Sequence, residues 1–168
     1  MRHLLLPGFL LLAALCSFAL AEAPRPPREL PAFSATDTLG NPVDLTALRG
    51  SVVLLNAWAT WCTPCRREIP FLSALQSREA ARGLQVVGVS VDEAADREAV
   101  LAAVPQLGIR YPVWLDPAGR VSELVHTTAV PASVLIDRDG TVRWRHVGLL
   151  RQQTPGFAEA LAAALDQP

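Results

Sequence analysis

The chain has 168 residues, of which 51% are hydrophobic and 18% are charged, and its 15 basic and 16 acidic side chains nearly balance. This hydrophobic fraction, without any long polar or repetitive tract, excludes a disordered chain and a solenoid. All the basic residues are arginine and lie scattered along the chain, so they form no stripe that could follow a phosphate backbone. The composition therefore predicts one compact domain that does not bind nucleic acid.

Residues 1–21 have the pattern of a secretory signal peptide. Arg2 precedes an apolar stretch over residues 4–20, and Ala19 and Ala21 supply the small side chains that flank a cleavage site. Cleavage after Ala21 would release the domain into the periplasm or another extracytoplasmic space. Residues 4–20 also approach the ~20 apolar residues that span a bilayer, which leaves an uncleaved membrane anchor as the alternative.

Residues 22–31 contain four prolines, which deny a helix its backbone donors and predict an extended linker. The folded domain is therefore expected to span residues 32–168. The last helix is expected to begin with Thr154 as its N-cap and Pro155 at its first position. Apolar periodicity and turn residues predict the preceding elements, in chain order, as strands at 33–35, 42–45 and 52–58, a helix at 63–81, a strand at 84–91, a helix at 94–104, a strand at 111–115, a helix at 119–126, and strands at 133–137 and 141–147.

The order of these elements indicates an α/β fold. Strands that alternate with helices build a sheet with helices on both faces, and the hairpins expected near each end of the domain make the sheet mixed. The near-continuous apolar run at 52–58 is typical of a central strand that is covered on both faces. We therefore expect a central mixed β-sheet flanked by helices.

Cys62 and Cys65 form a C-x-x-C motif where the strand at 52–58 gives way to a helix. The first helical turn brings side chains i and i+3 together, so the two sulfurs could pass between thiols and a disulfide without backbone movement. Cys62 stands at the helix start, where unpaired N–H groups and the positive end of the helix dipole stabilise a thiolate. This spacing predicts a redox disulfide with Cys62 as the nucleophile and Cys65 as the resolving cysteine.

Four other uses of the cysteine pair are weighed against this interpretation. A structural disulfide would close only a short loop and restrict the unfolded chain little. Structural zinc would need more ligands, and only His126 and His146 remain to complete a set, so we expect no metal and no cofactor. Haem attachment is excluded because Arg66 stands where the motif requires histidine. A Cu(I)-binding metallochaperone that uses both thiolates is the alternative from another class of protein.

The run NAWATWCTPCRREIP at residues 56–70 resembles the active-site segment of the TlpA/ResA-like thiol-disulfide oxidoreductases of the thioredoxin superfamily. The likeness extends downstream to Val130-Pro131 and Gly148. It implies a thioredoxin-like fold with an N-terminal β-hairpin and a central αβ insertion around residues 92–115. It also implies an enzyme that reduces or exchanges disulfides of extracytoplasmic proteins, including those of cytochrome c or oxidase maturation. A membrane thiol-disulfide electron donor would be its second partner, because the compartment is oxidising.

The resemblance also assigns roles around the cysteines. Glu68 matches a buried acid that tunes the thiol pKa values or relays a proton to Cys65. The alternative is a solvated side chain favoured by the helix dipole. Trp61, Thr63 and Pro64 are assigned to substrate binding, although plain packing would also account for the tryptophan.

Pro131 matches the family's cis-proline, and the backbone of Val130 would hydrogen-bond an extended substrate. A turn or edge-strand proline is the alternative. Three positions depart from related patterns. Thioredoxins carry a buried aspartate where this chain has Asn56, which leaves the proton role to Glu68. Reductants dedicated to cytochrome c maturation have Gly and Glu beside the cis-proline, where this chain has Val130 and Ala132.

Overall fold

The computed structural model describes residues 32–167. The predicted signal segment at 1–21 and the predicted linker at 22–31 lie outside the described residues. Within the described part of the chain, no helix is both long enough and apolar enough to cross a membrane.

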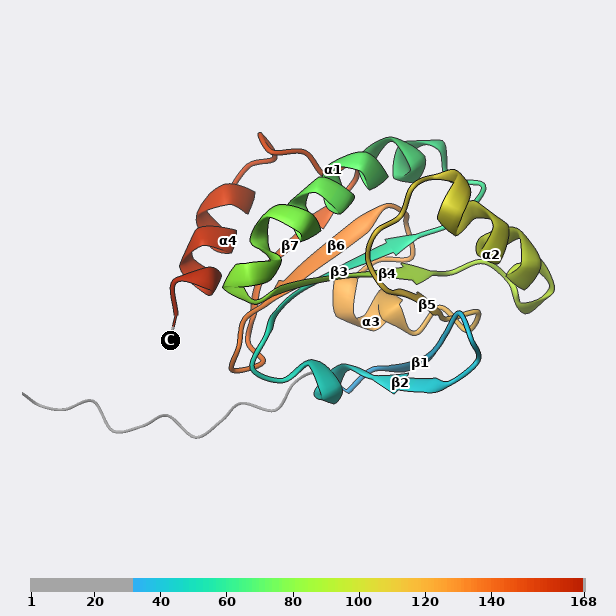
Figure 1. Cartoon of the computed structure of the whole chain (residues 1–168), viewed down its shortest axis with the longest axis horizontal. Helices are drawn as coiled ribbons and strands as arrows, with labels where there is room; N and C mark the ends of the chain where they lie inside the picture. The colour runs from blue at the N-terminus through green and yellow to red at the C-terminus, as the bar shows by residue number, and fades with distance from the viewer. Residues whose placement is uncertain (1–31, 168) are drawn as a thin grey trace, which may run out of the picture.

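A seven-stranded mixed β-sheet forms the centre of the domain (Figure 1). The strands are β1 (Ser34–Asp37), β2 (Pro42–Asp44), β3 (Val52–Trp58), β4 (Leu84–Ser90), β5 (Val113–Leu115), β6 (Ala132–Ile136) and β7 (Val142–Val147). Across the sheet they follow the order β2-β1-β5-β4-β3-β6-β7. β4 runs parallel to β3 and β5, and the other neighbouring pairs are antiparallel. The predicted mixed sheet is confirmed, with strand bounds that differ by one or two residues.

Helices cover both faces of the sheet, as predicted. The α-helices are α1 (Thr63–Glu79), α2 (Arg97–Gln106), α3 (Val121–Val125) and α4 (Phe157–Leu165). α1, α2 and α4 lie on one face and α3 lies on the other (Figure 1). Within residues 92–115, a 3-10 turn (Ala94–Asp96) precedes α2, and β5 then joins the sheet between β1 and β4.

β3 is the central strand, and all of its residues are buried. Val52 and Leu54 pack toward α1 and α4, whereas Val53 and Leu55 pack toward α3. This alternation follows from the two-residue period of a strand. Trp58, at the carboxyl end of β3, joins a third cluster that contains both active-site cysteines. The strand therefore anchors the site from the middle of the core.

The helix that follows β3 begins at Thr63, as predicted. Cys62 is its N-cap residue, and Pro64 occupies its first turn, where a missing N–H costs no intrahelical hydrogen bond. The helix ends at Glu79, and the chain continues as a 3-10 turn to Gly83. Gly83 has φ 90°, a left-handed conformation that stops the helix and that residues with a Cβ rarely adopt.

The last helix begins at Phe157, so the predicted start at Pro155 is wrong. Gly156 has φ 72° and ψ −4°, which suits the third position of a type II turn and not a helix. The Thr154 carbonyl accepts a hydrogen bond of 3.1 Å from the Phe157 N–H, which closes that turn. The Thr154 hydroxyl caps no helix, because it accepts from the Arg151 N–H (2.9 Å).

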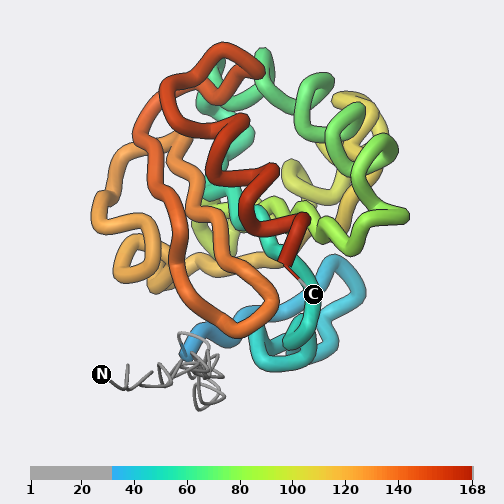
Figure 2. The backbone as a smooth tube through the Cα atoms, turned by 90° about the vertical axis from the view of Figure 1, so that its left-hand side faces the viewer, coloured from blue at the N-terminus to red at the C-terminus, as the bar shows by residue number. Residues whose placement is uncertain are grey.

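The chain ends with α4 lying against the β6–β7 hairpin (Figure 2). Trp144 of β7 meets Phe157 of α4 with ring centroids 5.1 Å apart, and Phe71 of α1 lies 6.1 Å from the same ring. These contacts fix the loop at 148–156 beside α1. They thereby place the backbone of Leu150, which is fully buried, next to the active-site helix.

Candidate active site

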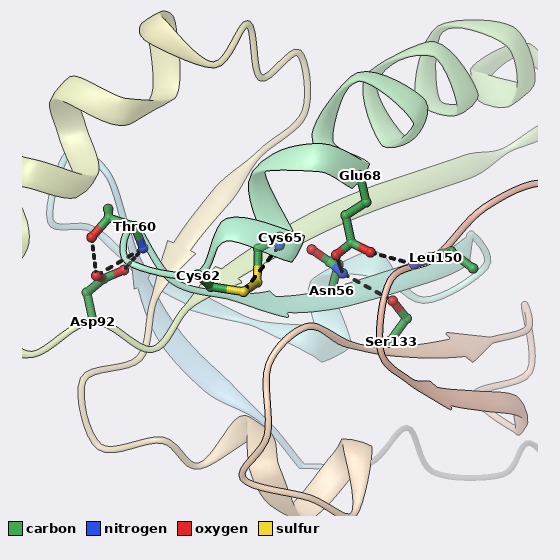
Figure 3. The surroundings of a disulfide bond; sticks show 8 residues. All are labelled: Asn56, Thr60, Cys62, Cys65, Glu68, Asp92, Ser133 and Leu150. Atoms are coloured by element: carbon green, nitrogen blue, oxygen red, sulfur yellow. Dashed lines mark hydrogen bonds between the residues drawn. A yellow bond between two sulfur atoms is a disulfide. The ribbon is translucent and has the colours of Figure 1, made fainter.

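Cys62 and Cys65 form a disulfide at the junction of β3 and α1 (Figure 3). Their Cα atoms are 5.3 Å apart, as the first turn of a helix allows. The Cys65 N–H donates a hydrogen bond to the Cys62 Sγ at 3.2 Å. Because this N–H belongs to the first turn of α1, it would stabilise negative charge on the Cys62 sulfur after the disulfide is reduced.

The two cysteines differ in their access to solvent. Cys62 keeps 4% of its surface exposed, whereas Cys65 is completely buried. A partner molecule can therefore reach Cys62 before it reaches Cys65. This asymmetry fits a pair in which Cys62 exchanges with the substrate and Cys65 acts from within the protein.

Exposed side chains surround the entrance to the disulfide. Trp61 is 68% exposed, although its neighbour Cys62 is buried. Thr63 and Pro64, between the cysteines, also face the solvent. Trp61 thus contributes little to the core, and its large apolar ring remains free to contact another molecule.

The Val130–Pro131 peptide bond is cis, and it immediately precedes β6. The Pro131 carbonyl accepts a hydrogen bond of 2.8 Å from the Gly148 N–H. Val130 is half-buried and packs against the cluster that contains both cysteines. A hollow of about 230 Å³ lies beside Val130, and its walls include Val91, Thr127 and other uncharged residues.

Glu68 lies inside the protein with 1% of its surface exposed, so the solvated alternative does not describe it. Its Oε1 accepts from the Asn56 Nδ2, and its Oε2 accepts from the Leu150 N–H, both at 2.7 Å. Burial raises the pKa of Glu68 to about 7, because the two hydrogen bonds offset only part of the cost of desolvating the charge. A carboxyl group with this pKa can hold or release a proton near neutral pH.

Asn56 links Glu68 to the sheet. Its Nδ2 also donates to the Ser133 Oγ at 3.1 Å, while its Oδ1 is buried without a hydrogen-bond partner. This free acceptor lies on the side chain that already bonds Glu68, so rotation of the amide would let it accept the proton of a neutral carboxyl group. Tyr111 is part of the same interior, where burial and the charge of Glu68 raise its pKa.

Sequence reasoning missed four residues that shape the site. Leu150 contributes through its backbone N–H, which no side-chain pattern could have indicated. Ser133 lies within the apolar strand β6, and its hydroxyl accepts a hydrogen bond from Asn56. Thr60 and Asp92 bond each other beside the disulfide (Figure 3). For Asp92 the available signal was a charged residue two positions after β4, because the carboxyl ends of parallel strands commonly form sites.

The histidines considered as zinc ligands lie in separate elements. His126 is the C-cap residue of α3, and His146 lies on β7, stacked on Trp144 with ring centroids 5.5 Å apart. Among residues 32–167, no three His, Cys, Asp or Glu side chains are grouped so that they could hold a metal ion.

The mixed sheet, with a C-x-x-C disulfide at the start of its first long helix, defines a thioredoxin-like thiol-disulfide oxidoreductase. The AhpC/TSA family matches residues 26–145, and the chain belongs to this family. It is 32% identical to the thiol-disulfide oxidoreductase ResA of Bacillus thuringiensis over 145 residues, which cover 86% of this chain and 83% of that protein.

A second relative and a solved structure are similar to this chain at comparable identity and coverage. ResA of Bacillus subtilis is 30% identical over 150 residues, with 84% of this chain and 83% of that protein covered. A Chlorobium tepidum structure described as the thiol:disulfide interchange protein DsbE superposes with a TM-score of 0.73. That structure shares 34% identity, and the match covers 82% of this chain and 95% of the other. The resemblance to ResA-like thiol-disulfide oxidoreductases is therefore confirmed.

Proposed function

We propose that this enzyme is exported and reduces or exchanges the disulfides of extracytoplasmic proteins through Cys62 and Cys65. The difference in burial between the two cysteines carries the proposal, because it orders the two steps of exchange. Export is supported by the signal-like pattern at residues 1–21. An uncleaved segment at 4–20 would instead anchor the enzyme to the outer side of the cytoplasmic membrane.

In the reductive direction, the Cys62 thiolate attacks one sulfur of the substrate disulfide. The substrate S–S bond breaks, a mixed disulfide forms, and the departing substrate sulfur takes up a proton. Cys65 then loses its proton and attacks the Cys62 sulfur. The second substrate thiol leaves, and the enzyme retains the Cys62–Cys65 disulfide seen in the structure. Two electrons pass from the enzyme to the substrate.

Glu68 is proposed to accept the proton that Cys65 loses. The two residues lie one helical turn apart in α1, and both are buried. Water has little access to Cys65, so an internal base is required for fast deprotonation. Because the pKa of Glu68 is about 7, its carboxyl group can accept this proton at neutral pH.

The substrate is proposed to bind across the entrance to the disulfide. Trp61, Thr63 and Pro64 would contact it on one side of Cys62, and Val130 with Pro131 would contact it on the other. An extended substrate segment could pair with the backbone of Val130, because this residue lies beside the disulfide and two positions before the start of β6. The neighbouring hollow of about 230 Å³ has room for one uncharged substrate side chain.

A reducing role requires a supply of electrons. The extracytoplasmic space favours disulfides, so the enzyme would return to its oxidised form after each cycle. A membrane thiol-disulfide donor is the partner that this chemistry requires. Maturation of c-type cytochromes or oxidases is the specific role that we infer from the resemblance to the TlpA/ResA-like family. An oxidised C-x-x-C-H peptide, compared with insulin as a general substrate, would test that role.

The reduction potential of the Cys62–Cys65 pair tests the direction of the reaction. The purified protein is equilibrated with thiol buffers, and the reduced fraction is measured by alkylation. We expect a potential at or below about −220 mV, in the range of thioredoxins and glutaredoxins. A value near about −120 mV would overturn the reductive proposal, because it is typical of an oxidant such as DsbA.

A further inference from the structure

Thr60, two residues before Cys62, is held by a buried carboxylate from another part of the chain. Its N–H donates to both oxygens of Asp92, at 3.1 and 3.0 Å, and its hydroxyl donates to Oδ1 at 2.6 Å. Figure 3 shows the two side chains facing each other beside the disulfide. Asp92 is only 4% exposed. Both hydrogen-bond donors of Thr60 therefore end on one carboxylate that is shielded from water.

Asp92 is itself fixed to the sheet. The Ser90 hydroxyl donates to its Oδ2 at 2.8 Å, and its own N–H donates to the Ser90 Oγ at 3.2 Å. Ser90 is buried at the end of β4, directly beside Trp58 of β3. The Val91 N–H continues the ladder by donating to the Trp58 carbonyl at 2.9 Å. The carboxylate is thus a rigid extension of the two central strands.

The segment that Asp92 holds is the turn between β3 and α1. The Cys62 N–H donates to the Ala59 carbonyl at 3.1 Å, which closes a turn over residues 59–62. Ala59 is completely buried, whereas Trp61 projects into solvent. Thr60 is one of the two central residues of this turn. Its side chain is bonded to Asp92, which is in turn bonded to Ser90 at the end of β4. Its position sets the direction in which the chain enters Cys62.

We propose that Asp92 is a positioning residue for thiol-disulfide exchange, because its bonds to Thr60 hold Cys62 in place against the N-terminal amides of α1. This inference rests on the proposed function of the cysteine pair. In the oxidised protein, the disulfide also restrains Cys62. After reduction that restraint is gone, and the 59–62 turn with its anchor on Asp92 must keep the Cys62 sulfur aligned. The effect is therefore expected in the reduced enzyme, which is the reactive form.

Asp116 provides a matched control. It is completely buried at the end of the neighbouring strand β5, and its N–H donates to the Ser90 carbonyl at 2.9 Å. Its Oδ2 accepts from the Val121 N–H at 2.7 Å, so its carboxylate supports the start of α3 and makes no hydrogen bond to the 59–62 turn. Asp116→Asn therefore removes the same kind of buried charge without disturbing the anchor of Cys62.

The experiment uses the full chain in its reduced form with the variants Asp92→Asn, Thr60→Val, Thr60→Ser and Asp116→Asn. The rate constant for the reaction of Cys62 with a small aromatic disulfide is measured as a function of pH, together with insulin reduction and urea unfolding. We expect Asp92→Asn and Thr60→Val to slow both reactions by roughly tenfold, since small errors in placement are costly in catalysis. Thr60→Ser keeps the hydroxyl and should remain within twofold of the wild type, as should Asp116→Asn.

The inference would be overturned if Asp92→Asn and Thr60→Val lost stability yet reacted as fast as Asp116→Asn. Thr60→Val removes a single hydroxyl and carries the test if Asp92→Asn does not fold. A wild-type enzyme that reacts with the small disulfide but with neither insulin nor the oxidised C-x-x-C-H peptide would contradict the proposed function. The role of Asp92 would still be decided by the rates with the small disulfide.

Discussion

The amide Nδ2 of Asn56 donates a buried hydrogen bond of 2.7 Å to the carboxyl Oε1 of Glu68. Glu68 lies one helical turn after Cys65 in α1. The Leu150 N–H occupies the other carboxyl oxygen. Both oxygens therefore face donors, which favours the carboxylate, while burial favours the neutral acid. The balance brings the pKa of Glu68 to about 7. Rotation of the Asn56 amide would turn its free Oδ1 toward Glu68, which would give the neutral acid an acceptor as well.

Replacement of Glu68 by glutamine should slow the resolution step and change its pH dependence. In the wild type we expect the rate of resolution to fall as the pH drops below about 7, because Glu68 becomes protonated and can no longer accept a proton. Glu68→Gln should abolish this fall in rate below pH 7. It should also lower the rate of resolution by roughly 10²-fold, the lower range of general base catalysis. Stopped-flow decay of a mixed disulfide would measure the rate. A wild-type profile in the variant would show that Glu68 does not relay the proton.

The same residue should make the stability of the oxidised protein depend on pH. The pKa of Glu68 is about 7 in the folded protein, compared with 4.5 for an unperturbed glutamate, so the folded state binds more protons between these values. The contribution of Glu68 to the free energy of unfolding is thus fully present below pH 4.5. This contribution falls as the pH rises toward 7, by roughly 3 kcal/mol in total.

The difference in unfolding free energy between the wild type and Glu68→Gln isolates this contribution. In urea titrations, the unfolding free energy of the wild type should exceed that of Glu68→Gln by more at pH 5 than at pH 8. Glu159→Gln, on the exposed side of α4, controls for the loss of one charge. An equal difference at the two pH values would contradict the assignment.

The two cysteines should have separate phenotypes. Cys65→Ala is expected to accumulate a mixed disulfide between Cys62 and its substrate, because the buried resolving thiol is missing. Cys62→Ala should reduce insulin only at the uncatalysed rate, since Cys65 has no exposed surface. Non-reducing electrophoresis and a turbidity assay would measure these outcomes. Insulin reduction by Cys62→Ala would show that Cys65 attacks the substrate directly.

Gly88 should not tolerate a side chain. A Cβ atom at this position in β4 would lie 3.0 Å from the Cε2 of Tyr111 and 3.2 Å from the Nε1 of Trp58. Both rings are buried and cannot move freely, so Gly88→Ala should destabilise the protein by about 1–3 kcal/mol. Urea unfolding would measure the loss, with Gln85→Ala in the same strand as the control. Unchanged stability would mean that the two rings can shift at little cost.

Local pattern was sufficient for the scaffold of this enzyme. The apolar run of β3 identified a central strand because every second side chain faces the same layer, and both layers are apolar here. The C-x-x-C spacing identified the redox pair because a helical turn alone brings Cys62 and Cys65 together. The start of α4 was misplaced, since Thr154 and Pro155 favour both a helix start and a type II turn, and the left-handed Gly156 selects the turn.

The chemistry around the sulfurs depended on contacts between distant parts of the chain. The sequence suggested Glu68 through resemblance, but its pKa is raised by burial within the folded domain and is lowered in part by the hydrogen bond from the Leu150 N–H, 82 residues further along the chain. The bond between Thr60 and Asp92 spans 32 residues and left no periodic signal. A residue pattern reports which side chains face a core. The charge state of a buried acid, and the group that holds a turn in place, are set by whatever the fold packs against them.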